Sequence, residues 1–115
     1  MPMRVGFGNF RKQMLERELA RIIETLPMFG IEKAILVGDM ATGRYTPDSR
    51  IDLIVVHKTD KPFGRRADFF YYHINSAVAV ESQVYTPEEF DTVQKTNPTV
   101  RRALEQGRVI FDAAE

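Results

Sequence analysis

The sequence of 115 residues contains no cysteine, which excludes disulfide bonds and metal sites built on thiolates. Its 16 acidic and 16 basic residues leave no formal net charge, so there is no general electrostatic attraction to nucleic acid. No apolar run is long enough to span a membrane, and the N-terminal segment lacks the apolar core of a signal peptide. With a length that suits one modest core, these absences predict a single domain over residues 1–115 in the cytoplasm, without a membrane or nucleic-acid partner.

Four segments show the pattern of helices. Apolar residues recur at helical spacing through the first of them, after a glycine-containing lead-in over residues 1–9 that is predicted to be irregular. Thr86, a following proline and Glu89 form a capping-box sequence, and Asn97 before a second proline starts another helix, which Gly107 ends. The predicted helices cover residues 10–26, 65–72, 87–95 and 98–106.

Apolar runs between these helices predict the strands of a sheet. The predicted strands cover residues 31–37, 50–57 and 78–85, and residues 109–111 form a last strand or an extended tail. The composition of residues 59–64 is typical of a turn, and the polar segment 39–49 is predicted to be the loop between the first two strands.

The stretch from Gly38 to Asp52 joins the first two strands and holds most of the residues suited to chemistry. Arg50 and Asp52 are one strand period apart, so both side chains should project from the same face. A carboxylate that faces a glycine turn at the edge of a sheet is a geometry that holds a metal ion against phosphate.

This stretch resembles the nucleotidyltransferase superfamily that includes DNA polymerase beta, and in particular the minimal nucleotidyltransferases. A common form of their motif is Gly-Ser-x-Ala-x-Gly-x-x-x-x-Asp-Ser-Asp-Ile-Asp-Leu. The matching positions are Gly38, Ala41, Gly43, Asp48, Ser49, Ile51, Asp52 and Leu53. The resemblance covers about residues 12–112, because the predicted third strand carries Glu81 and a Tyr-Thr-Pro-Glu-Glu-Phe segment follows it. It implies an α/β (α+β) fold with a mixed sheet and helices packed mainly on one side.

The resemblance also implies an activity, which is the transfer of a nucleoside monophosphate from a nucleoside triphosphate to a hydroxyl group. Asp52 and Glu81 match the catalytic carboxylates that bind Mg²⁺ or Mn²⁺, and the metal ions neutralise the triphosphate and activate the attacking hydroxyl. Gly38 and Asp39 match the turn that binds the nucleotide phosphates, where backbone N–H groups approach them.

Two positions depart from the family motif. Asp39 replaces the motif serine, and Arg50 replaces the first metal-binding aspartate. Arginine has no lone pair to offer a metal ion and stays protonated. Two unit charges about 4 Å apart interact by roughly 4 kcal/mol at an effective dielectric constant near 20, so this exchange turns a strong attraction into repulsion. We therefore predict impaired activity, with Asp39 and Arg50 forming an ion pair that blocks the metal and phosphate position.

Three functional alternatives follow from these residues. The first is a working nucleotidyltransferase that uses Asp52 and Glu81, with Asp39 as a substitute ligand. The second is a pseudo-enzyme that keeps the fold for binding and needs no cofactor, and the third is an antitoxin that binds a helical HEPN-type partner. A homodimer would also suit a short chain with an aromatic segment, Phe69 to Tyr72, although this cluster is predicted to belong to the core rather than to stack on bases. His57 and His73 lack metal-ligand spacing and are predicted to be structural.

Overall fold

The computed structural model describes the backbone of residues 2–114 and the side chains of residues 9–68 and 74–114. Its elements in chain order are α1 (Pro2–Thr25), the 3-10 helix η1 (Leu26–Phe29), β1 (Ile31–Val37), α2 (Asp39–Thr42), β2 (Ile51–His57), α3 (Phe63–Ile74), β3 (Val80–Tyr85), α4 (Pro87–Thr96), α5 (Pro98–Gln106) and β4 (Arg108–Asp112). None of the helices in this described range is both long and apolar enough to cross a membrane.

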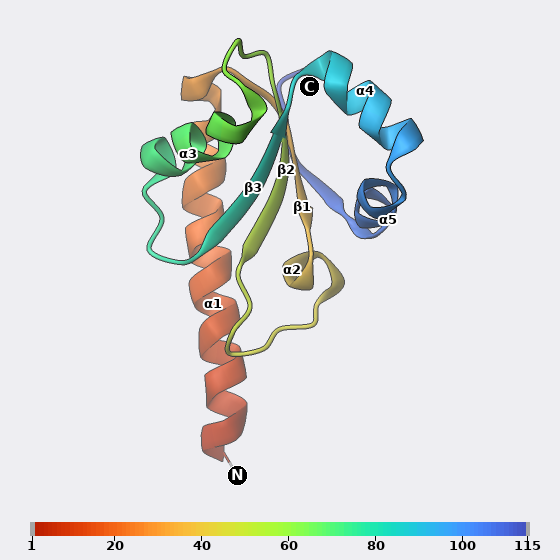
Figure 1. The fold of residues 1–115 in the computed structure, drawn as a ribbon. Helices are drawn as coiled ribbons and strands as arrows, with labels where there is room; N and C mark the ends of the chain where they lie inside the picture. Colours follow the sequence, from red (N-terminus) through yellow and green to blue (C-terminus); the bar gives the residue numbers. More distant parts are fainter. Residues whose placement is uncertain (1, 115) are drawn as a thin grey trace.

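The four strands form one mixed sheet in the order β3-β2-β1-β4 (Figure 1). β1 is antiparallel to both β2 and β4, whereas β2 and β3 are parallel. Parallel neighbours need a crossover connection, and α3 supplies it between β2 and β3. The predicted α/β class with a mixed sheet is therefore confirmed.

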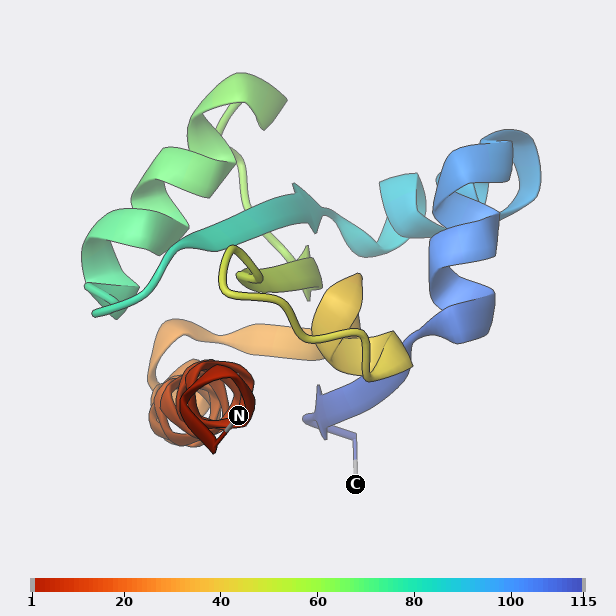
Figure 2. The same cartoon turned by 90° about the horizontal axis from the view of Figure 1, so that it is seen from below.

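Helices cover both faces of this sheet (Figure 2). α1 and α3 lie over the larger cluster of buried residues, and α4 and α5 lie over a smaller cluster on the opposite face. Successive strand residues point to opposite faces, so Leu53 and Val55 of β2 belong to the larger core and Ile54 belongs to the smaller one. The sequence led us to expect helices mainly on one side of the sheet, and the larger core under α1 and α3 corresponds to that side. The other face also carries helices, because the central strands are apolar on both faces and need a second helical layer.

Several element bounds differ from the predicted ones. α1 begins at Pro2, so the irregular lead-in predicted for residues 1–9 is wrong from residue 2 onward. Glycine lowers helix stability by about 1 kcal/mol per residue but does not forbid a helix, and proline is tolerated in the first turn. α2 occupies the start of the predicted loop 39–49, and α3 begins at Phe63, inside the predicted turn.

The capping signals of α4 and α5 are confirmed. The Thr86 side chain accepts a hydrogen bond from the Glu89 backbone N–H, and the Glu89 side chain accepts one from the Thr86 N–H. Asn97 Oδ1 accepts from the N–H groups of Thr99 and Val100 at the start of α5. These local contacts use groups that are close in sequence, which explains why the sequence predicts them well.

The predicted roles of the Phe69 to Tyr72 cluster and of His73 lie outside the described side chains. His57 is partly buried at the end of β2, and burial lowers the pKa of its imidazole.

Candidate functional site

The candidate site begins at Gly38, directly after β1. Its backbone angles, φ 73° and ψ −152°, fall in a region that is essentially restricted to glycine. A Cβ atom at this position would overlap Asp52 Oδ2 and would lie 3.1 Å from Asp52 Cγ. Glycine is therefore required by its dihedral angles and also by the carboxylate that lies against its backbone.

The strand register brings the two predicted catalytic carboxylates together. Asp52 pairs with Val37 of β1 on one side and with Glu81 of β3 on the other. Directly paired residues on neighbouring strands share a face, and their backbones are about 4.8 Å apart. Asp52 and Glu81 are therefore direct neighbours on one face of the sheet.

The guanidinium group of Arg50 bridges these two carboxylates. Its Nε donates a hydrogen bond to Asp52 Oδ1 at 2.9 Å, and its Nη2 forms an ion pair with Glu81 Oε2. The side chain of Asp52 is only 22% exposed, whereas those of Arg50 and Glu81 are more than half exposed. One fixed positive charge therefore lies between the two carboxylates that the family motif assigns to metal ions.

The structure does not join Asp39 and Arg50 in the ion pair predicted from the sequence. The Asp39 Oδ2 atom instead accepts a hydrogen bond from the Ser49 hydroxyl at 2.9 Å. Within the described residues, Arg50 makes its ion pairs with Asp52 and Glu81. The charge of Asp39 has only a small effect on Arg50. The hydrogen bond with Asp52 is the largest cause of the raised pKa of Arg50, and the charge of Asp39 is the smallest.

Ser49 connects the loop of the site to helix α1. Its hydroxyl accepts a hydrogen bond from the Thr46 backbone N–H at 2.8 Å, besides donating to Asp39. Its carbonyl accepts two hydrogen bonds from Arg11 of α1, at 2.8 Å from Nε and 2.6 Å from Nη2. Arg11 was not predicted from the sequence, because no local pattern relates a helical arginine to a carbonyl 38 positions away.

A pocket of about 260 Å³ lies over the bridged carboxylates. Its lining residues are Val37, Gly38, Arg50, Asp52, Leu53, Glu81, Gln83 and Ala103. Gln83 of β3 and Ala103 of α5 were not predicted from the sequence either. Ala103 lies at this position because α5 packs against the smaller core.

Burial raises the pKa of the Asp52 carboxyl above its usual value, and the hydrogen bond from Arg50 opposes this effect without cancelling it. A nearby cation favours the ionised form of a carboxyl group that burial disfavours. Arg50 is the cation that the structure provides.

The residues of the cleft do not fit the metal ions that the family uses. Hard divalent cations need several oxygen ligands, and the family supplies three carboxylates from its two strands. Here Arg50 stands at the first of these three positions, and its guanidinium pairs with the carboxylates at the other two. The described part of the chain contains no group of three or more histidine, aspartate or glutamate side chains arranged to hold a metal ion.

The nucleotidyltransferase domain family model matches residues 16–110, and the chain belongs to this family. A crystal structure from Sulfolobus solfataricus, provisionally described as a nucleotidyltransferase, has a similar fold with a TM-score of 0.57 and 14% sequence identity. That similarity covers 96% of this chain and 88% of the other. No curated protein matches the sequence significantly.

Proposed function

We propose that this protein is a nucleotidyltransferase-family member that has lost metal-dependent nucleotide transfer, because Arg50 occupies the position of a metal ion. The observation that supports this proposal is the guanidinium bridge between Asp52 and Glu81. A guanidinium carries one charge where a metal ion carries two, and it cannot activate a hydroxyl or water molecule as a coordinated cation does.

The electrostatics of the cleft also disfavour a nucleoside triphosphate. Asp39, Asp52 and Glu81 carry three negative charges against the single positive charge of Arg50, so these four groups sum to minus two. Arginine can bind phosphate directly, but two of the Arg50 donor atoms are already committed to carboxylates. A polyanion therefore meets net repulsion unless divalent cations screen it.

Metal and nucleotide titrations of the purified protein test this proposal. Isothermal titration calorimetry with Mn²⁺, and with ATP in the presence of Mg²⁺, would compare the wild type with Arg50→Asp and with the double variant Arg50→Asp, Asp39→Ser. We expect no saturable binding to the wild type and measurable Mn²⁺ binding to both variants, because the substitution supplies the missing carboxylate and removes the bridging cation.

The matched control is Arg44→Asp, which makes the same charge change at an exposed residue outside the pocket lining. A general gain of negative charge would raise metal binding in both Arg50→Asp and Arg44→Asp. Binding of two Mg²⁺ ions by the wild type as tightly as by Arg50→Asp would refute the proposal and restore the working enzyme as the better account.

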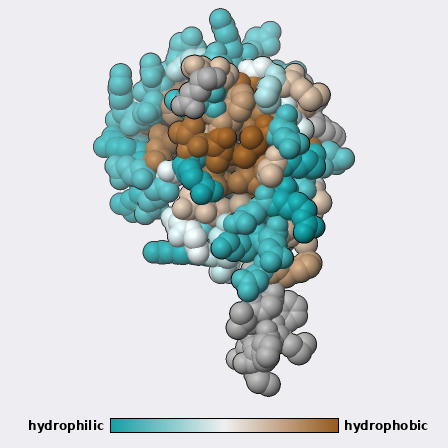
Figure 3. Space-filling view, turned by 180° about the vertical axis from the view of Figure 1, so that it is seen from behind, coloured by the Kyte–Doolittle hydropathy of each residue, from teal (hydrophilic) through white to brown (hydrophobic). Residues whose placement is uncertain are grey.

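A second role, as a binding module for another protein, is favoured by the surface. Apolar side chains gather on the face opposite the view of Figure 1 (Figure 3), where β4 forms the edge of the sheet. Val109 of β4 is 53% exposed, and exposed apolar patches on a single chain often mark interfaces. A homodimer and the helical HEPN-type partner of the resemblance stay predictions, which co-purification and light scattering would test.

A further inference from the structure

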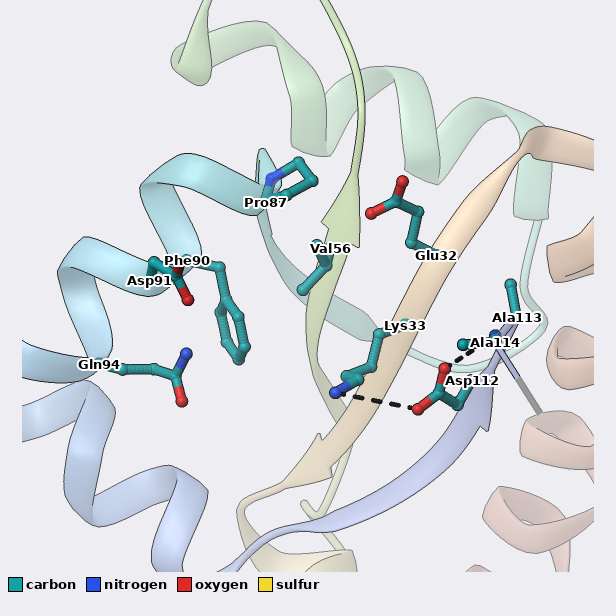
Figure 4. A pocket seen from close by; sticks show the side chains of 10 residues that line it. All are labelled: Glu32, Lys33, Val56, Pro87, Phe90, Asp91, Gln94, Asp112, Ala113 and Ala114. Atoms are coloured by element: carbon teal, nitrogen blue, oxygen red, sulfur yellow. Dashed lines mark hydrogen bonds and ion pairs between the residues drawn. The ribbon is translucent and has the colours of Figure 1, made fainter.

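Helix α4 stands away from the sheet and leaves an open groove of about 670 Å³ beneath it (Figure 4). The groove lies on the same face as the candidate site but at the other end of the strands, and it does not share a residue with that site. Its lining residues are Glu32, Lys33, Val56, Pro87, Phe90, Asp91, Gln94, Asp112, Ala113 and Ala114. Its volume is in the range of about 300–1,000 Å³ that is typical of binding pockets.

The packing of α4 leaves part of its apolar surface uncovered. A surface helix normally buries its apolar stripe against the core. In α4, Phe90 and Val93 pack against the smaller core but are only partly buried, and none of the ten positions is fully buried. The neighbouring helix α5 buries Val100 in the second core. The ring of Phe90 is only partly buried, and Figure 4 shows it directed into the groove, on the same side as Val56. The groove therefore offers an apolar floor.

The rim of the groove is acidic. Glu32 and Asp112 stand on the strand side and Asp91 on the helix side, while Lys33 is the cation among the lining residues. Three carboxylates and one ammonium group give the lining a net charge of minus two. Lys33 is already associated with Asp112 at 3.9 Å, and among the described residues neither Glu32 nor Asp91 makes an ion pair.

We propose that this groove is a docking surface for a basic segment of a partner protein. An apolar side chain of that segment would lie against Phe90 and Val56, and a flanking lysine or arginine would place its charged group between Glu32 and Asp91. Long basic side chains suit such a site, because their apolar stems cover hydrophobic surface while their charged ends reach the rim. The ring of Phe90 adds a cation–π contact.

Charge complementarity selects this occupant over others. An acidic segment would place like charges opposite Glu32 and Asp91, which costs affinity and slows association. The proposal is independent of the activity of the Arg50 cleft, because the two regions have separate linings. The groove would be present whether or not the protein is an active nucleotidyltransferase.

Two synthetic peptides test the proposal on the full chain. They are fluorescein-labelled Gly-Arg-Leu-Arg-Gly and its acidic twin, Gly-Glu-Leu-Glu-Gly. We expect the basic peptide to bind at least about tenfold more tightly in fluorescence anisotropy, which corresponds to about 1.4 kcal/mol. We also expect the basic peptide to change the amide chemical shifts of the protein in NMR spectra, with the largest changes at Val56, Phe90, Gln94 and Ala113.

Charge reversal of the rim supplies the decisive comparison. The double variant Glu32→Lys, Asp91→Lys should invert the preference and bind the acidic peptide, whereas Glu105→Lys, an exposed acid of α5 outside the groove, should keep the wild-type preference. If the double variant does not fold, the milder Glu32→Gln and Asp91→Asn variants provide the test. Each should lower the affinity for the basic peptide and reduce the salt dependence of its binding.

The proposal would be overturned by equal binding of both peptides, by no saturable binding of either, or by shifts that centre outside the groove. A loss of affinity for the basic peptide in Glu105→Lys as large as in the groove variants would show a nonspecific charge effect and would also overturn the proposal. Concentration-dependent self-association that shifts the same groove amides would identify a second copy of the chain as the occupant and would also refute a basic partner segment.

Discussion

The two ends of the sheet face that carries α4 and α5 are held together by different physical means. At the Gly38 end, a buried carboxylate lies against a glycine backbone and a guanidinium closes the gap between two strands. At the α4 end, the first turn of the helix carries the Thr86 cap and an ion pair between Glu89 and Arg66, and Phe90 and Val93 pack against the smaller core. The contact between Gly38 and Asp52 leaves no room for an added atom, whereas α4 leaves an open groove.

The first region is occupied by side chains of the chain itself, because Arg50 forms ion pairs with both Asp52 and Glu81. In our proposal, Arg50 thereby takes the position that binds metal in the family. The groove under Phe90 keeps apolar and acidic surface exposed, although Phe90 packs in part on the smaller core and Lys33 is paired with Asp112. Substitutions in the two regions should therefore differ both in size and in their dependence on pH.

The largest effect is expected for Gly38→Ala. The new Cβ overlaps the Asp52 carboxylate and the backbone angles are restricted to glycine, so we expect a loss of about 3 kcal/mol or more in the free energy of unfolding. Gly43→Ala is the matched control, because Gly43 also has a positive φ, 78°, but no atom lies within 4 Å of the place that a Cβ would take there. Urea denaturation should show a loss of only about 1 kcal/mol for this control. Equal losses would mean that the Asp52 contact is unimportant.

An intermediate effect is expected for Glu89→Gln at the start of α4. Arg66 is buried and would lose the carboxylate that balances its charge, so we expect a loss of about 1–2 kcal/mol at pH 7. The neighbouring substitution Glu88→Gln, at an exposed position in the same helical turn, should cost only about 0.3 kcal/mol.

The same variant has a defined pH dependence. The hydrogen bond from Arg66 lowers the pKa of Glu89 below its usual 4.5, so the stabilisation from this carboxylate is present above that value. It is lost as the pH falls through the lowered pKa. The gap in unfolding free energy between wild type and Glu89→Gln should therefore narrow on acidification below about pH 4.5. A gap that stays constant to low pH would argue against a contribution from charge.

The smallest effect on stability is expected for Arg50→Met. Its ion pairs are largely exposed, so the loss at pH 7 should be below about 1 kcal/mol. Arg50 opposes the rise in the pKa of Asp52 caused by burial, so removing it should raise that pKa further. A raised carboxyl pKa means that stability falls as the pH rises through it, and the loss should therefore vanish at low pH, where both carboxyls are protonated. NMR titration of Asp52 would check the direction, with Arg44→Met as the control.

The residues of the site were accessible to sequence analysis to different degrees. Gly38, Asp52 and Glu81 could be identified because they match positions of the family motif, whose spacing is visible in the sequence. The partners of Arg50 could not be identified, because only the strand geometry decides that Asp52 and Glu81, and not Asp39, lie beside its guanidinium. Arg11 could not be identified either, since its contact with Ser49 joins two elements that are far apart in the chain.

The groove was outside the reach of sequence analysis altogether. The segment from Thr86 to Phe90 predicts where α4 begins, through its cap, but not how far the helix lies from the sheet. That distance depends on tertiary packing, because the opposite wall of the groove is formed by residues of β1, β2 and β4 and by the two residues that follow β4.

By itself the sequence determined the periodicities, the caps and the exchange of an aspartate for Arg50, because these depend on neighbouring residues or on chemical identity. Only the tertiary structure decided that Arg50 bridges Asp52 and Glu81, and that α4 leaves a groove open. The reason is that strand register and helix packing bring together atoms whose proximity no local interaction specifies.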